Sequence, residues 1–301
     1  MKEIQFRRTE LEDRDMMHTY FQKFPSRSCE RTFANALLWS RHYPVMFAEI
    51  EDTLVFRSKD EEGEAYTYPA GEPENVKKAL EVLKGYTEER NVPLVLYHVT
   101  QAQFAQLEEW YPGRFELELN RDIADYIYES EKLATLAGKK LHAKRNHINK
   151  FKATHENWSY ETMTVENLEE CFQMALKWRN ENECDEDHEK NAEMCVTLNA
   201  LRLFEELELV GGVLKNNGQV IAFTIGEPLS EDTFVVHIEK AFADIQGAYP
   251  MINQQFVEHE CMNYQYINRE EDTGAEGLRK AKLSYRPAFL EEKGLVKEKA
   301  V

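Results

Sequence analysis

A β-hairpin in the second half of the chain constrains the fold more than any other local feature. Two largely apolar runs, residues 210–215 and 219–227, flank an Asn217-Gly218 pair. This dipeptide favours a type I′ turn, whose two central residues take positive φ and whose strands return antiparallel. A third run, residues 233–240, also has strand character. The sequence therefore predicts a hairpin followed directly by a further strand.

Helices flank these strands along the chain. One is expected to begin with Thr164 as its N-cap and a second to cover about 189–207, both before the hairpin. After the third strand, Gly247 marks a turn and Pro250 the first turn of another helix. A strand near residue 266 and a last helix from about Ala275 close this half. The second half is thus predicted to be a mixed α+β domain.

The first half contains the same kinds of element. Val45–Ile50 and residues 53–56 are typical of a hairpin around a Glu51-Asp52 turn. The further elements expected are helices over 73–90 and 101–110 and strands over 93–98 and 114–119. Because 301 residues suffice for two cores of ordinary size, we expect two α+β domains, 1–135 and 136–301.

The composition limits the classes of function. Acidic residues outnumber basic ones by 55 to 37, and the formal net charge of -18 argues against a surface built entirely for nucleic acid. The first residues lack the apolar stretch of a signal peptide, and no apolar run approaches the roughly 20 residues that span a bilayer. Five cysteines at irregular spacing fit reduced thiols. We therefore expect a cytoplasmic protein without a transmembrane segment.

One short segment reverses the overall charge. Between Lys132 and His155 there are seven lysines and arginines and no acidic residue. Positive charge at this density can neutralise phosphates, so the segment is a possible contact for tRNA or another nucleic acid. The candidate residues are Lys139, Lys140, Lys144, Arg145 and Lys150. The alternative is a solvated linker helix that balances the charge of two acidic halves.

Common catalytic signatures are absent from the sequence. It has no G-x-S-x-G, G-x-G-x-x-G or P-loop motif, which argues against serine hydrolases, dinucleotide enzymes and nucleotide-hydrolysing motors. Cys184, His188 and Cys195 could in principle ligate a metal, but their spacing matches no common zinc module. We interpret this segment as an acidic loop entering a helix, and no metal site is predicted.

Polar residues in the second half are candidates for a functional site. His237 and Glu239 lie two apart on a strand and would share one face, where they could line a cleft. The turn that follows has exposed backbone N–H groups at a helix N-terminus, which can hold an anion. This turn consists of Gln246, Gly247 and Ala248. A satisfied polar residue on a strand and an ordinary strand-to-helix turn are the structural alternatives.

Positive charge is also concentrated in the last predicted helix. Its candidate residues for binding an anion are Arg279, Lys280 and Lys282, with Tyr285 nearby. An exposed C-terminal helix would explain the same residues without a ligand. Because the surrounding domain is acidic, the concentration of cations favours the anion site.

The segments that carry these candidates resemble a known family. The relevant runs are HIEKA from His237, QGAY from Gln246, NQQF from Asn253 and NREEDTG from Asn268, which leads into 277–287. They are similar to a largely uncharacterised bacterial family related to the C-terminal catalytic domain of phosphatidylglycerol lysyltransferases. With 139–151 and 32–39, the similarity covers nearly the whole chain. It implies tandem N-acetyltransferase-like (GNAT) domains with mixed central sheets flanked by helices, shared more distantly with Fem-type aminoacyltransferases.

The resemblance further implies an acyltransferase site in the second domain. In this fold an acceptor amine or hydroxyl attacks an activated acyl carbonyl beside splayed central strands, whose N–H groups stabilise the oxyanion. Glu239 would act as general base or orient the acceptor, and His237 competes for that role. Tyr285 would protonate the leaving group. Phosphate would be held by the turn at Gly247 and by Arg279, Lys280 and Lys282.

The donor implied is aminoacyl-tRNA or acyl-CoA, with no bound cofactor. The turn at Gly247 has lost most of the glycines of a pyrophosphate-binding loop, which favours aminoacyl-tRNA. The chain lacks the transmembrane portion of the lipid-modifying enzymes, so a small-molecule or a lipid acceptor is possible. Two alternatives remain, a CoA-dependent N-acyltransferase and a non-catalytic binding protein that kept the fold.

Overall fold

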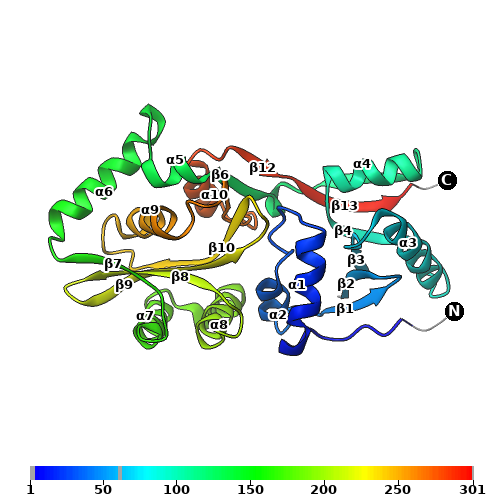
Figure 1. The fold of residues 1–301 in the computed structure, drawn as a ribbon, viewed down its shortest axis with the longest axis horizontal. Helices are drawn as coiled ribbons and strands as arrows, with labels where there is room; N and C mark the ends of the chain where they lie inside the picture. The colour runs from blue at the N-terminus through cyan, green and yellow to red at the C-terminus, as the bar shows by residue number, and fades with distance from the viewer. Residues whose placement is uncertain (1–3, 60–62, 300–301) are drawn as a thin grey trace. The chain divides into compact units, whose positions relative to one another are not determined.

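A computed structural model describes residues 4–59 and 63–299, and Figure 1 shows its helices and strands. The chain forms two compact units. Unit 1 consists of Met1–Asp125, Glu271–Gly274 and Glu291–Val301, and unit 2 of Tyr126–Glu270 and Ala275–Leu290. Each unit has its own sheet and helices, so each is described separately.

Unit 1 is built on a mixed sheet. Its strands are β1 (Val45–Ile50), β2 (Thr53–Lys59), β3 (Glu64–Thr67), β4 (Val95–Thr100), β5 (Phe115–Leu119) and β13 (Lys293–Glu298). Its helices are α1 (Arg14–Lys23), α2 (Phe33–Trp39), α3 (Pro73–Glu88) and α4 (Gln101–Trp110). The strand order is β1-β2-β3-β4-β13-β5, with β3 and β4 parallel. Residues such as Tyr66, Leu83 and Leu96 pack in its core.

Unit 2 has the second mixed sheet. Its strands are β6 (Asp125–Glu129), β7 (Trp158–Thr162), β8 (Val210–Asn216), β9 (Gln219–Pro228), β10 (Thr233–Ala241), β11 (Tyr266–Asn268) and β12 (Phe289–Glu291). Its helices are α5 (Ser130–Thr135), α6 (His142–Thr154), α7 (Leu168–Glu181), α8 (His188–Arg202), α9 (Ala248–Glu260) and α10 (Glu276–Leu283). The order is β12-β6-β11-β10-β9-β8-β7. Helix α9 covers one face of this sheet, and α7 and α8 cover the other (Figure 1).

Both predicted hairpins are confirmed. Glu51 and Asp52, between β1 and β2, have φ of 51° and 54°. Asn217 and Gly218, between β8 and β9, have φ of 51° and 77°. Positive φ at both central residues is what a type I′ turn requires, and it is the reason that Asn-Gly is a strong hairpin signal.

The division of the chain differs from the predicted boundary at 135/136 in two ways. The division falls after Asp125, so the basic segment belongs wholly to unit 2, where Ile148 and Phe151 anchor α6 with buried side chains. The second difference concerns β13. The prediction placed these residues in the second domain, whereas β13 lies between β4 and β5 in the sheet of unit 1. Helix α6 is therefore an integral part of unit 2.

The acidic segment enters a helix, as predicted. Asp187 caps α8 by accepting from the backbone N–H groups of Glu189 and Lys190 at 3.0 and 3.1 Å.

Among the described helices, none combines the length and the apolar composition needed to cross a membrane.

Candidate active site

Strands β10 and β11 separate near the centre of the unit 2 sheet. Their parallel pairing ends at Val235 and Asn268. Beyond this point β10 continues, with a bulge at His237 in its register against β9, whereas the chain leaves β11 as a loop. A bulge re-aims side chains, and it is frequent beside functional sites. The side chains of β10 and of residues 269–270 therefore meet where the two strands diverge.

His237 joins this loop to β9 through two carboxylates. Its Nδ1 lies 2.7 Å from Glu270 Oε1 and its Nε2 lies 2.9 Å from Glu227 Oε1. Burial alone would lower the pKa of His237, but the two carboxylates raise it to about 10. The imidazolium donates both N–H groups and keeps no lone pair for another proton. The geometry therefore supports a structural role for His237 and does not support the predicted role as general base.

Hydrogen bonds from two other parts of unit 2 hold the Glu239 carboxylate. Its Oε1 accepts from Arg269 Nη2 at 2.8 Å, and its Oε2 accepts from Asn253 Nδ2, on α9, at 3.0 Å. The side chains of Glu239 and Arg269 are only 11% and 12% exposed. Thr224 of β9 lies directly opposite Glu239, so the two side chains share a face of the sheet. This arrangement orients Glu239 toward α9.

Three buried polar atoms surround Glu239 without a partner. Arg269 Nη1, Asn253 Oδ1 and Thr224 Oγ1 make no hydrogen bond within the described part of the chain. Buried polar groups are almost always hydrogen-bonded, since leaving one unpaired costs roughly 1–3 kcal/mol. One of the atoms is a donor, one is an acceptor, and the hydroxyl can be either. All three belong to residues that neighbour Glu239 through a hydrogen bond or through the β9–β10 register, and they are candidate contacts for a polar ligand.

Tyr285 and Lys144 lie beside the same guanidinium. The Arg269 guanidinium carbon is 4.8 Å from the Tyr285 ring centroid, and Lys144 Nζ is 3.9 Å from that centroid. Burial raises the pKa of Tyr285 well above its ordinary value, although Arg269 opposes the effect. The phenol is therefore protonated at neutral pH, as a proton donor must be. Glu239 and Tyr285, both predicted from the sequence, are thus brought together through Arg269.

The predicted anion-binding turn packs against a helix. Gly247 has φ of 91°, and a Cβ built on it would lie 2.6 Å from the carbonyl oxygen of His147 on α6. The backbone N–H of Ala248 donates to Ile245 O at 3.1 Å. Gln246 is exposed. The glycine is therefore required by its conformation and by the close approach of α6.

The cations of α10 have different surroundings. Lys280 is exposed and Arg279 is half-buried. Lys282 is buried, and its ammonium donates to the carbonyls of Arg269 and Glu270 at 2.6 and 3.2 Å. Lys282 thus positions the loop that carries Arg269, which does not support the predicted phosphate contact. A common pocket for the turn at Gly247, the cations of α10 and His237 stays a prediction.

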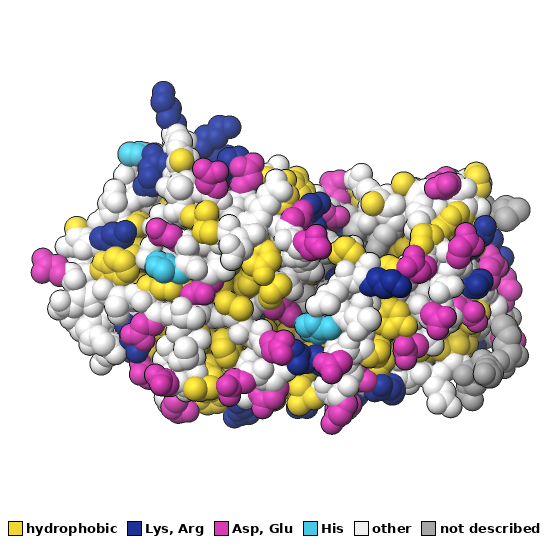
Figure 2. Space-filling model, in the orientation of Figure 1, with side chains coloured by type: hydrophobic (Ala, Val, Ile, Leu, Met, Phe, Trp, Pro, Cys, Tyr) yellow, Lys and Arg dark blue, Asp and Glu magenta, His cyan; other side chains and the backbone are white. Residues whose placement is uncertain are grey.

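The basic segment presents only some of its cations to solvent. Lys139 and Lys140 of the short helix η3 (Lys139–Leu141) and Lys150 of α6 are exposed, and Figure 2 shows Lys and Arg gathered over this part of unit 2. Arg145 instead donates to backbone carbonyls of the preceding loop, including that of Gly138 at 2.8 Å. Lys144 lies beside Tyr285. The candidates of this segment therefore divide into surface residues and residues with local partners.

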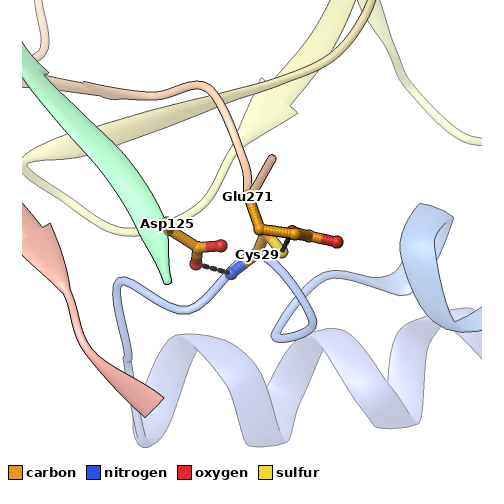
Figure 3. A group of neighbouring side chains, drawn as sticks. All are labelled: Cys29, Asp125 and Glu271. Atoms are coloured by element: carbon orange, nitrogen blue, oxygen red, sulfur yellow. Dashed lines mark hydrogen bonds between the residues drawn. The ribbon is translucent and has the colours of Figure 1, made fainter. Parts of the chain in front are cut away.

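A separate cluster in unit 1 could offer ligands to a metal. Cys29, Asp125 and Glu271 each place one ligand atom within 4.8 Å of the others (Figure 3). However, the Lys293 ammonium lies 3.0 Å from Asp125 Oδ1 and 2.8 Å from Glu30 Oε1. Burial raises the pKa of the Cys29 thiol, which disfavours the thiolate that metals bind. The cation of this cluster is therefore Lys293 itself.

The sequence did not single out Arg269, Asn253 or Thr224. Arg269 and Asn253 lie within two of the runs that carry the family resemblance, but nothing in those runs indicates that they meet at Glu239. Thr224 has no local signal, because it is one polar residue in an apolar strand. The register of β9 against β10 is what places it there.

Comparisons with known proteins are consistent with this fold. Residues 21–296 match the family model described as phosphatidylglycerol lysyltransferase, C-terminal. A protein of unknown function from Bacteroides thetaiotaomicron has a solved structure that is 40% identical, with a TM-score of 0.92 over 99% of this chain and 100% of that chain. An uncharacterised protein of Mycoplasmoides gallisepticum is 24% identical over 233 residues, which are 76% of this chain and 73% of the other.

A more distant structure shows the same fold. L-PGS from Bacillus licheniformis is 14% identical, with a TM-score of 0.63 over 95% of this chain and 92% of that chain. Together with two mixed sheets flanked by helices, this similarity confirms the predicted tandem GNAT-like fold class.

Proposed function

Because the chain belongs to the phosphatidylglycerol lysyltransferase C-terminal family, a family of GNAT-like acyltransferase domains, we propose that unit 2 transfers an aminoacyl group from aminoacyl-tRNA to an amine or hydroxyl acceptor. The acyl group would lie against Glu239 at the divergence of β10 and β11.

The observation that carries this proposal is the set of unpaired polar atoms around Glu239. An aminoacyl ester presents an ammonium, which donates hydrogen bonds, and a carbonyl, which accepts them. Asn253 Oδ1 and Thr224 Oγ1 can accept from the ammonium, and Arg269 Nη1 can donate to the carbonyl. An acetyl thioester has the carbonyl and no donor. The site therefore matches an aminoacyl group better than an acetyl group.

The turn at Gly247 supports the same choice of donor. A pyrophosphate of CoA needs several backbone N–H groups directed at one point. In this turn the Ala248 N–H is bonded to Ile245 O, and α6 approaches Gly247 so closely that its backbone lies against the glycine. A tRNA could instead be held outside the catalytic loop, with the exposed Lys139, Lys140 and Lys150 as candidate contacts.

The site residues then take specific roles. Arg269 would bind the ester carbonyl and stabilise the oxyanion that develops on it. Glu239, with both oxygens already engaged, would orient Arg269 and attract the donor ammonium. Tyr285, protonated beside Arg269, would donate its proton to the ribose oxygen that leaves. His237 would hold the loop that presents Arg269.

Transfer assays with two donors test the proposal. The purified protein is incubated with a labelled aminoacyl-tRNA pool, and separately with acetyl-CoA, alongside amines, alcohols and phosphatidylglycerol vesicles. We expect transfer from aminoacyl-tRNA, reduced at least about 100-fold by Arg269→Ala or Glu239→Gln. Glu206→Gln, an exposed carboxylate of the same unit, is the matched control. Acetyl transfer that depends on Glu239, without tRNA deacylation, would establish the CoA-dependent alternative; binding without turnover would establish a non-catalytic protein.

A further inference from the structure

Lys144 is the one cation of the basic segment that lies against the candidate site. The exposed lysines of the same segment, Lys139, Lys140 and Lys150, face solvent. Lys144 is half-buried, and its Nζ lies over the Tyr285 ring at 3.9 Å from the centroid. Its amine is thus next to the proposed proton donor and outside the surface that would contact tRNA.

The surroundings of Lys144 disfavour its charged form. Among the described residues, no carboxylate lies within ion-pair distance of Nζ, although Glu239 of β10 attracts it from further away. The Arg269 guanidinium repels it, whereas the face of the Tyr285 ring, 3.9 Å from Nζ at its centroid, attracts an ammonium. Burial, the repulsion from Arg269 and the weaker attraction of Glu239 together lower the pKa of Lys144 to about 8. At pH 7 roughly one-tenth of the amine is then neutral, compared with about 0.03% at the ordinary value of 10.5.

The other ionisable groups of the site are already engaged. Both oxygens of Glu239 accept hydrogen bonds, and both ring nitrogens of His237 contact carboxylates. A general base needs a lone pair that can reach the proton it removes. Lys144 offers that lone pair, because its stem is fixed on α6 and its amine ends at the site.

We propose that Lys144 is the general base that activates the acceptor in the acyl transfer proposed above. This inference rests on that proposed function. The neutral amine of Lys144 removes the proton of an acceptor hydroxyl, or one N–H proton of a neutral acceptor amine, and the lone pair of the acceptor attacks the ester carbonyl carbon. The bond from that carbon to the ribose oxygen breaks, and Tyr285 protonates the leaving oxygen. The proton held by Lys144 then restores the phenol, so the net change moves one proton from acceptor to ribose.

The pH dependence of transfer tests this assignment. With a hydroxyl acceptor, which does not titrate in this range, we expect wild-type kcat/KM to rise through an apparent pKa of about 8. Lys144→Arg keeps the positive charge but supplies no base, so it should reduce kcat/KM at least about 100-fold. Lys144→Ala should lose activity similarly, and added propylamine should restore part of it. An arginine variant that keeps wild-type activity and pH profile would overturn the assignment, because charge alone would then suffice.

A matched control is available in the same unit. Lys177 lies over the Phe242 ring at 4.7 Å from the centroid, but its side chain is 67% exposed and lies on α7. Lys177→Arg and Lys177→Ala should leave kcat/KM and its pH profile unchanged. A loss of activity in these variants equal to the loss at Lys144 would show a general effect of lysine substitution, and would overturn the assignment.

Chemical labelling separates this inference from the proposed function. Competitive acetylation by acetic anhydride, measured by mass spectrometry on the Lys144 peptide, requires no transferase activity. A titration near pH 8 supports Lys144 as an available base, and this readout does not depend on turnover. A preparation with that titration that transfers nothing from any donor would refute the proposed function without refuting the titration of Lys144. A titration near 10.5 overturns the assignment, even in an active protein.

Discussion

Replacing His237 by glutamine should remove a buried cation on which two carboxylates depend. The side chains of His237 and Glu227 are 9% and 4% exposed, and that of Glu270 is 21% exposed. Glutamine is similar in length but neutral, so it leaves Glu227 buried without a positive partner. Breaking a buried ion pair from one side typically costs about 3–5 kcal/mol. We expect a loss in that range for the free energy of unfolding at pH 7.

The same substitution should change the pH dependence of stability. The pKa of His237 is raised from its ordinary 6.5 to about 10, so the native state binds this proton more tightly than the unfolded chain. The stabilisation is therefore complete below about pH 6.5 and is lost as the pH rises toward 10. Between these values the slope from one proton is about 1.4 kcal/mol per pH unit.

Urea unfolding at several pH values between 6 and 10 measures both effects. The free energy of unfolding of the wild type should fall steadily over this range. That of His237→Gln should be lower at pH 6 and should change less with pH. Glu227→Gln in the His237→Gln background should recover part of the loss, because the uncompensated carboxylate is then removed. His188→Gln, an exposed histidine of unit 2, should stay within about 0.5 kcal/mol of the wild type. If the free energies of unfolding of wild type and His237→Gln depend on pH in parallel, then His237 is not a cation paired with both carboxylates.

Three further predictions concern other parts of the chain. Gly138 and Gly247 both have φ of 91°, but of these two only Gly247 has a neighbour within 4 Å of an added Cβ. Gly138→Ala should lower the free energy of unfolding by about 1–2 kcal/mol. Gly247→Ala should lower it by about 1–3 kcal/mol more, as measured by thermal or urea unfolding. Lys293→Met should destabilise unit 1 by about 3–5 kcal/mol, since Glu30 and Asp125 lose their buried cation. Lys297→Met, at an exposed position of the same strand, should have little effect in the same measurement. Charge reversal of Lys139, Lys140 and Lys150 together should weaken tRNA binding in filter assays and reduce its log–log salt slope by about one unit for each phosphate that is no longer neutralised; an unchanged slope would leave these lysines as a solvated face.

The sequence was informative where structure is decided locally. Asn217-Gly218 specifies a turn by its own backbone preferences, and the strands beside it follow from that turn. The position of β13 could not be predicted in this way. Its partners β4 and β5 end at Thr100 and Leu119, far earlier in the chain, and six residues of strand character do not identify the sheet that they will join. The division after Asp125 also depends on long-range pairing, because β6 joins the unit 2 sheet beside β11.

The candidate site was only partly predictable. Glu239 and Tyr285 were proposed from their positions in recognisable segments, but what they contact depends on where β10 and β11 diverge. His237 and Glu239 were expected to act alike because they alternate along one strand. Their partners differ, since the loop after β11 offers Arg269 to one and Glu270 to the other. Lys144 was grouped with a charged surface, because a charge pattern does not indicate which side of a helix is buried.

The proposed function requires the atoms around Glu239 to bind an aminoacyl group, and ligand discrimination tests this binding. Isothermal titration calorimetry would compare a stable amide-linked aminoacyl adenosine with the matched analogue that lacks only the α-ammonium. Loss of one hydrogen-bonded charged group costs about 1.5–3 kcal/mol, so we expect the ammonium-bearing analogue to bind at least about 10-fold more tightly. Asn253→Leu, which removes an acceptor, should reduce this preference. Equal affinity for the two analogues, or tighter binding of the one without the ammonium, would show that this site does not recognise an aminoacyl group.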